Sequence, residues 1–149
     1  MNALRDRHAA RLLVIDAADR LLLFRFDPGD RPPFWATAGG ECEAGESYED
    51  AARRELLEET GIAAEPGEAV DARDSIFVTF EGEKVHAVER YFAIRVAETA
   101  IDVSGHSDME RRAMREHRWW TADELAACEE RYYPPDLPDL FARQREEAA

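Results

Sequence analysis

The segment 40–62 constrains this chain more than any other, because its carboxylates crowd a stretch that has the pattern of a helix. Glu55, Glu58 and Glu59 stand at positions i, i+3 and i+4, which places them within an arc of about 100° on a helical surface. Like charges this close destabilise a helix unless a positive group lies among them. A hard divalent cation, which prefers oxygen ligands, is the natural candidate. The sequence therefore predicts a metal-binding helix.

Both ends of this helix are also marked in the sequence. Ser47 is the expected N-cap, and Asp50 follows three residues later as a weaker form of the capping box. Gly61 is placed to end the helix as a C′ glycine. The helix is therefore predicted to start just after Ser47 and to end at Glu59 or Thr60.

Length and charge limit the kinds of protein and partner. A chain of 149 residues suits one domain, 1–149, with a single buried core. Its formal net charge of −14 argues against a broad basic surface for a nucleic-acid polymer. Small phosphorylated ligands stay compatible with this charge, because a bound metal supplies local positive charge. No apolar run approaches the ~18 residues of a membrane span, so a cytoplasmic protein without a membrane partner is expected.

Strand and helix patterns are mixed along the chain, which predicts an α/β fold with helices packed on a mixed sheet. The expected strands are 9–17, 21–26, 34–37, 70–80, 84–96 and 117–120. Helices are expected over 121–128, opened by a capping box of Thr121 and Glu124, and over 137–146. Residues 1–8 are expected to fray, and 103–109 to form a polar loop.

The central segment also fits a longer pattern at every specified position. Gly40, Glu46, Arg54-Glu55-Leu56, Glu58-Glu59 and Gly61-Ile62 fill the spacing G-x5-E-x7-R-E-U-x-E-E-x-G-U, where U is a bulky aliphatic residue. This spacing is the Nudix box, so the chain resembles a Nudix hydrolase. The order of the flanking strands also suits that family's α/β/α sandwich, in which a mixed sheet lies between helices.

The resemblance implies roles for the residues of the box. The implied ligands of Mg²⁺ or Mn²⁺ are Glu55, Glu58 and Glu59. The backbone carbonyl of Gly39 often completes the metal shell in the family. One glutamate takes a proton from the attacking water, and the family varies in which one does so, with Glu55 the base in some members. Arg54 pairs with Glu46 in the family, which would brace the loop against the helix.

Residues outside the box are expected to complete the site. Many family members place a glutamate shortly before the aromatic residue that leads into the last helix, so Glu116 is a candidate ligand or base, and Glu110 competes with it. Arg25 lies where an arginine contacts phosphate in some relatives, and Arg90 has similar standing. Trp35 could stack on a nucleobase. The ordinary alternatives are a surface glutamate, an edge-strand arginine and a core tryptophan.

The implied function is metal-dependent hydrolysis of a diphosphate linkage in a small nucleoside-diphosphate-X substrate. The X group would be chosen by loops outside the box, here 27–33, 103–109 and the region of Tyr132. Phe77 stands where the family's ADP-ribose enzymes often carry a proline, so ADP-ribose is a slightly less favoured substrate. A non-catalytic nucleotide-sensing module and an isomerase of a prenyl diphosphate are the alternatives. Dimers are common in the family, so a homodimer is a further expected partner.

Overall fold

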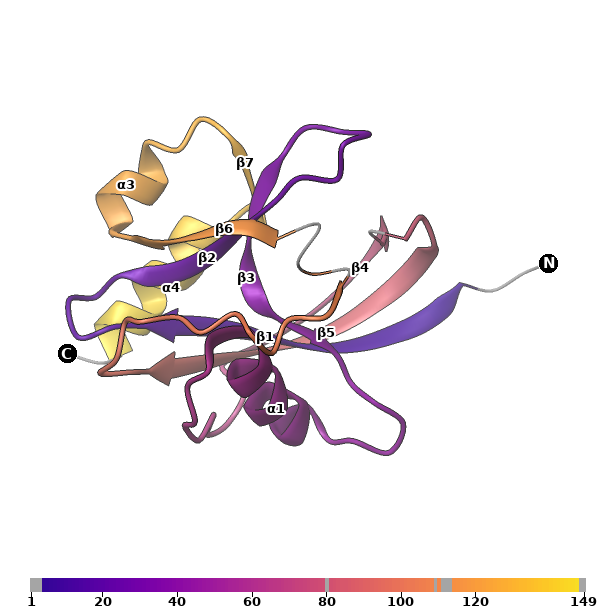
Figure 1. Ribbon diagram of the computed structural model, residues 1–149, viewed down its shortest axis with the longest axis horizontal. Helices are drawn as coiled ribbons and strands as arrows, with labels where there is room; N and C mark the ends of the chain where they lie inside the picture. Colours follow the sequence, from indigo (N-terminus) through magenta and orange to yellow (C-terminus); the bar gives the residue numbers. More distant parts are fainter. Residues whose placement is uncertain (1–3, 80, 109, 111–113, 148–149) are drawn as a thin grey trace.

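The computed structural model describes residues 4–79, 81–108, 110 and 114–147. The strands in these ranges are β1 (Arg5–Ile15), β2 (Leu21–Phe26), β3 (Phe34–Glu41), β4 (Asp71–Val78), β5 (Lys84–Arg95), β6 (Met114–Trp120) and β7 (Arg131–Tyr133). They form one sheet in the order β4-β5-β1-β2-β3-β7, and β6 pairs with β2 (Figure 1). The pairs β1–β5 and β3–β7 are parallel and the others are antiparallel, so the sheet is mixed, as predicted. Because β3 pairs with both β1 and β2, the sheet curls.

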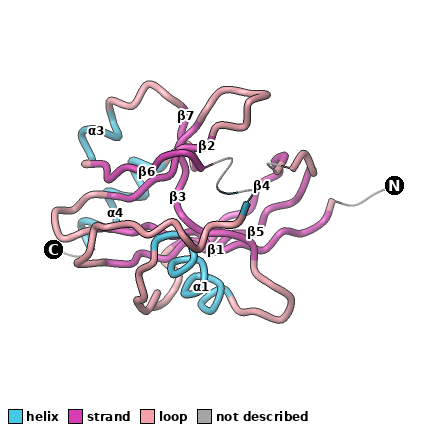
Figure 2. The backbone as a smooth tube through the Cα atoms, in the orientation of Figure 1, coloured by secondary structure: helices cyan, strands magenta, loops and turns pink. Residues whose placement is uncertain are grey.

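Helices cover both faces of this sheet, and they are coloured cyan in Figure 2. They are α1 (Tyr48–Thr60), α3 (Ala122–Ala126) and α4 (Leu137–Glu147). Side chains alternate between faces along a strand, so Leu12 on β1 packs with Leu56 of α1, whereas Leu13 packs with Phe141 of α4. Burial on both faces explains why residues 12–15 of β1 are apolar without interruption. The predicted α/β fold with helices on both faces is confirmed.

The ends of α1 agree with the prediction. The Ser47 hydroxyl accepts a hydrogen bond from the Asp50 N–H at 3.1 Å, which caps the first turn. Gly61 adopts a left-handed conformation with φ of 76° and donates its N–H to the Leu57 carbonyl. Local chemistry alone therefore places the helix that carries the glutamates.

The structure corrects several expected boundaries. Residues 5–8 do not fray, because they extend β1 in parallel register with β5; residues 1–3 lie outside the described residues. The strand expected over 34–37 continues to Glu41, since Gly39 and Gly40 keep their pairing with β1. The strand expected over 70–80 ends at Val78, and residue 80 lies outside the described part.

Two further differences lie in the C-terminal part. The strand expected from His117 begins at Met114, whereas residues 111–113 lie outside the described part. The three-residue strand β7 was not predicted, because so short a segment before two prolines carries no strand pattern of its own. In the described residues, no helix is both long enough and apolar enough to cross a membrane.

Candidate metal centre

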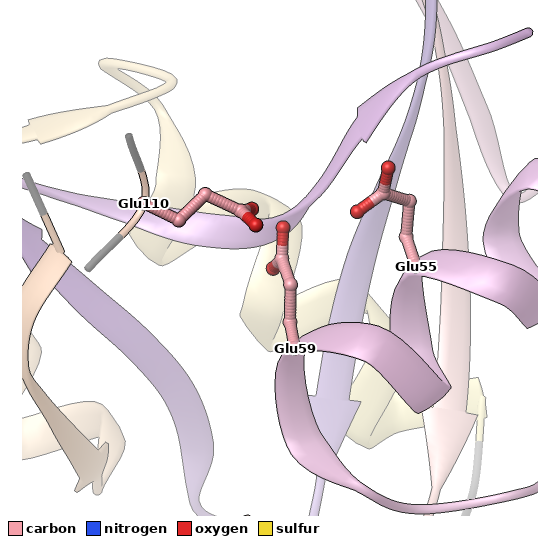
Figure 3. A group of neighbouring side chains, drawn as sticks. All are labelled: Glu55, Glu59 and Glu110. Carbon is pink, nitrogen blue, oxygen red and sulfur yellow. The ribbon is translucent and has the colours of Figure 1, made fainter. Parts of the chain in front are cut away.

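Three carboxylates converge at the C-terminal half of α1. Glu55, Glu59 and Glu110 each offer one oxygen atom, and these oxygens all lie within 4.8 Å of one another. Glu55 and Glu59 project from successive turns of α1, and Glu110 reaches them from the segment that precedes β6, with Glu59 between the other two (Figure 3). Glu59 is 1% exposed, Glu55 is buried and Glu110 is half-buried. The set is an all-oxygen cluster of the kind that hard divalent cations prefer.

The electrostatics of the cluster favour a cation. Burial raises the pKa of Glu59 well above its usual value, and the nearby carboxylates of Glu55 and Glu110 raise it further. Burial also raises the pKa of Glu55, although the neighbouring Arg54 guanidinium opposes that shift. A divalent cation among these oxygens would offset the cost of ionising them, so the residues present fit a metal.

Strand β3 passes next to the carboxylates of Glu55 and Glu59 and contacts both. The N–H of Gly39 donates to Glu59 Oε2 at 3.0 Å. At Gly40 an added Cβ would lie 2.6 Å from Glu55 Oε1, so a larger residue there would displace the Glu55 carboxylate. The glycines before and at the start of the box therefore set the position of Glu55 and Glu59.

Arg54 joins the loop before α1 to the cluster. Its Nε and Nη2 donate to the two carboxylate oxygens of Glu46, each at 2.9 Å. Its Nη1 donates to Glu55 Oε1 at 2.9 Å and to Glu58 Oε2 at 3.1 Å. The structure therefore contains the expected pair of Arg54 with Glu46. The same guanidinium also orients two of the glutamates. Arg54 therefore does more than brace the loop against the helix.

The structure does not bring Glu58 and Glu116 into the group of three carboxylates. The Glu58 side chain is 43% exposed and contacts Arg54. Glu116 is 54% exposed, and its Oε1 lies 3.5 Å from Nη1 of Arg25 on the neighbouring strand β2. Glu110, which the sequence left in competition with Glu116, lies in the cluster instead.

A sequence signal for Glu110 existed in the segment expected to be a loop. Ser107 and Glu110 form the S-x-x-E spacing of a capping box. In the structure, the Ser107 N–H donates to Glu110 Oε1 at 2.9 Å, and the Glu110 N–H donates to Ser107 Oγ at 3.1 Å. This reciprocal pair fixes the carboxylate, although the spacing by itself marks a helix start and not a metal ligand.

Two of the expected substrate-binding residues, Arg25 and Trp35, make their contacts with side chains outside this cluster. Arg25 donates two hydrogen bonds to Glu130, which also accepts from the Trp35 indole N–H at 2.9 Å. Trp35 is 5% exposed and packs edge-to-face on Trp120, so it takes the core position that was the alternative to base stacking.

Arg90 also lies outside the cluster. Its guanidinium lies over the ring of Tyr48 at 5.0 Å from the centroid. Tyr48 is the first residue of α1, whereas Glu59 is next to the last. Arg90 therefore packs at the opposite end of the helix from the carboxylates.

Comparison with known proteins identifies the family. The model of the NUDIX domain family matches residues 5–143. An uncharacterized Nudix hydrolase from Yersinia pestis is 42% identical over an alignment of 73 residues, and the match covers 44% of this chain and 38% of that relative. The match thus spans well under half of the curated relative's length.

Solved structures share the fold. The MutT protein from Methanosarcina mazei Go1 superposes with a TM-score of 0.68 at 21% identity and covers 99% of both chains. The NUDIX domain of Shewanella oneidensis NrtR, complexed with ADP ribose, superposes with a TM-score of 0.67 at 17% identity, over 97% of this chain and 90% of that one. With the family model, this likeness shows that the chain belongs to the Nudix hydrolase family.

Proposed function

We propose that this chain hydrolyses a diphosphate linkage in small nucleoside-diphosphate-X compounds, with Mg²⁺ or Mn²⁺ as the cofactor. The observation that supports the proposal is the convergence of Glu55 and Glu59, on the helix of the Nudix box, with Glu110 from the segment before β6, with carboxylate oxygens that all lie within 4.8 Å of one another. Nudix hydrolases generally use divalent metals, and the family and the fold support pyrophosphate hydrolysis of nucleoside diphosphate derivatives in general.

The residues of the site would have different roles in the reaction. Glu55, Glu59 and Glu110 would hold the cation, with Glu58 and the carbonyl of Gly39 as the further ligands that the family pattern implies. A bound cation neutralises phosphate charge and makes water a better nucleophile. Arg54 holds Glu55 and Glu58 in fixed orientation, so either carboxylate is in place to accept the proton that the water loses.

A substrate panel tests the proposal. The protein is incubated with Mg²⁺ and nucleoside triphosphates, ADP-ribose, nucleotide sugars or dinucleoside polyphosphates, and the products are identified by chromatography. We expect cleavage at a phosphoanhydride bond, loss of turnover with EDTA, and unchanged turnover in the control Glu49→Gln, whose side chain is exposed on the first turn of α1. Tight binding of a nucleotide without turnover of any compound would instead identify a nucleotide-sensing module.

The raised pKa of Glu59 predicts how metal stabilisation depends on pH. Without metal, the folded state loses stability as pH rises through this raised pKa, because the buried carboxylate must then ionise, whereas it already ionises at lower pH in the unfolded chain. Metal binds the ionised form. Added Mg²⁺ should therefore raise Tm more in mildly alkaline than in mildly acidic buffer. At about 100 times Kd the gain is about 2.7 kcal/mol, or roughly 5–10 °C.

This dependence is measured by thermal unfolding, followed by circular dichroism, with and without Mg²⁺. The control Glu49→Gln should show the wild-type shift, because its side chain is exposed and is not one of the three clustered carboxylates. An Mg²⁺-induced shift in Tm that is the same at both pH values would contradict the link between the buried carboxylates and the cation.

A further inference from the structure

The segment 102–107 docks on the C-terminal end of α1. The last carbonyl groups of a helix have no partner within it and need donors from elsewhere. Here the Asp102 N–H donates to the Thr60 carbonyl at 2.9 Å, and His106 Nε2 lies 2.8 Å from the Glu59 carbonyl oxygen. An added Cβ at Gly105 would lie 2.6 Å from the Glu58 carbonyl oxygen, so the two backbones are in direct contact. The carbonyl groups of successive helix residues thus face this one segment.

His106 is the side chain that makes this docking specific. It is buried, and its ring packs edge-on against Phe24 at a centroid distance of 5.7 Å. A carbonyl oxygen only accepts hydrogen bonds, so Nε2 carries the hydrogen and donates it to the Glu59 carbonyl. The ring is therefore held between a core residue and the backbone of a residue of the carboxylate cluster.

The last residue of the docked segment, Ser107, is the residue that orients Glu110. Ser107, the residue after His106, exchanges two hydrogen bonds with Glu110, one of them to the carboxylate itself. Glu55 and Glu59 come from a helix, whereas Glu110 is held, within the residues that the structure describes, by Ser107 of this segment. Its placement thus depends on how residues 102–107 are anchored.

We propose that His106 is a positioning residue, which anchors the segment 102–107 to the end of α1 and thereby brings Glu110 to the cation held by Glu55 and Glu59. The proposal rests on the metal-dependent function proposed above. His106 acts on cation affinity through Glu110, so its contribution vanishes when Glu110 can no longer serve as a ligand. A residue that merely stabilised the fold would not show this dependence.

A double-mutant cycle on the full chain tests the proposal, with Mn²⁺ as the probe and its Kd measured by electron paramagnetic resonance. Partners that orient metal ligands typically contribute 10–100-fold to affinity, so we expect His106→Leu to weaken Mn²⁺ binding by at least about tenfold. Glu110→Gln should weaken binding too. The double variant should bind no more weakly than Glu110→Gln alone.

Two further variants make the test specific. His106→Gln keeps an N–H donor and should restore part of the affinity lost in His106→Leu. His117→Leu is the matched control, because His117 also packs on Phe24, at 6.0 Å, but from β6. Its replacement should leave Kd unchanged. If His106→Leu does not fold, Ser107→Ala replaces it in the cycle, because that variant removes a hydrogen bond to Glu110 and leaves the ring contacts intact.

The outcomes separate this proposal from the proposed function. A wild-type chain that binds no Mn²⁺ overturns both. A wild-type chain that binds Mn²⁺, together with an unchanged Kd in His106→Leu, overturns the role of His106 alone. So do losses that add in the double variant, because His106 would then act independently of Glu110.

Discussion

Glu59→Gln is expected to lower kcat by at least about 10²-fold while the fold is kept, by analogy with the loss of other groups that stabilise transition-state charge. Glu59 lies between Glu55 and Glu110 and is almost fully buried, so no water molecule from bulk solvent readily takes its place. Glutamine has the same shape but no charge. Steady-state kinetics at saturating Mg²⁺, with circular dichroism of the same sample, measures both parts of this expectation.

The contacts of Glu58 make it the informative comparison. Its carboxylate lies outside the group of three and contacts Arg54, so Glu58→Gln is expected to lower kcat less than Glu59→Gln does. Helical spacing alone does not distinguish Glu58 from Glu59 as a metal ligand. Near-normal kcat in Glu59→Gln would show that the cluster does not hold the cation of the reaction, and a larger loss in Glu58→Gln would reverse the ranking that the geometry gives.

Gly39→Ala is expected to destabilise the protein by roughly 2–6 kcal/mol, the sum of a forbidden backbone conformation and a steric clash. Gly39 has φ of 133°, and an added Cβ would lie 2.1 Å from the Ala10 carbonyl oxygen on β1. Any shift that relieves the clash also moves the N–H that donates to Glu59. The free energy of unfolding from urea denaturation measures the loss.

Gly45→Ala is the matched control for this prediction. Gly45 also has a positive φ, of 77°, but nothing lies within 4 Å of an added Cβ. Its replacement should cost only the left-handed conformation, about 1–2 kcal/mol. Equal losses in the two variants would show that the contact between β3 and β1 at Gly39 is not tight.

Much of the fold was predictable because its determinants are local. Ser47 and Gly61 mark the ends of α1 through hydrogen bonds within a few residues, and the capping box of Thr121 and Glu124 marks the start of α3. Strand β7 and the start of β1 at Arg5 were not predictable in this way. Both are strands because of partners far along the chain, which no local pattern records.

The same distinction between local and tertiary determinants applies to the residues of the site. Helical spacing brings Glu55 and Glu59 together, and the box supplies the pair of Arg54 with Glu46. The choice between Glu110 and Glu116 depended on how the segment before β6 packs on the end of α1, which is a tertiary contact. Trp35 could not be assigned for a similar reason, since Glu130, the partner of its indole N–H, is distant in sequence.

The most direct measurement is a Mn²⁺ titration, followed by electron paramagnetic resonance, of the wild-type chain, Glu59→Gln and Glu49→Gln. The wild type and Glu49→Gln are expected to bind Mn²⁺ with the same Kd, because Glu49 is exposed and lies outside the carboxylate cluster. Glu59→Gln is expected to bind at least about tenfold more weakly, since it removes a buried ligand. Equal affinity in all three proteins would contradict a metal centre built on Glu55, Glu59 and Glu110.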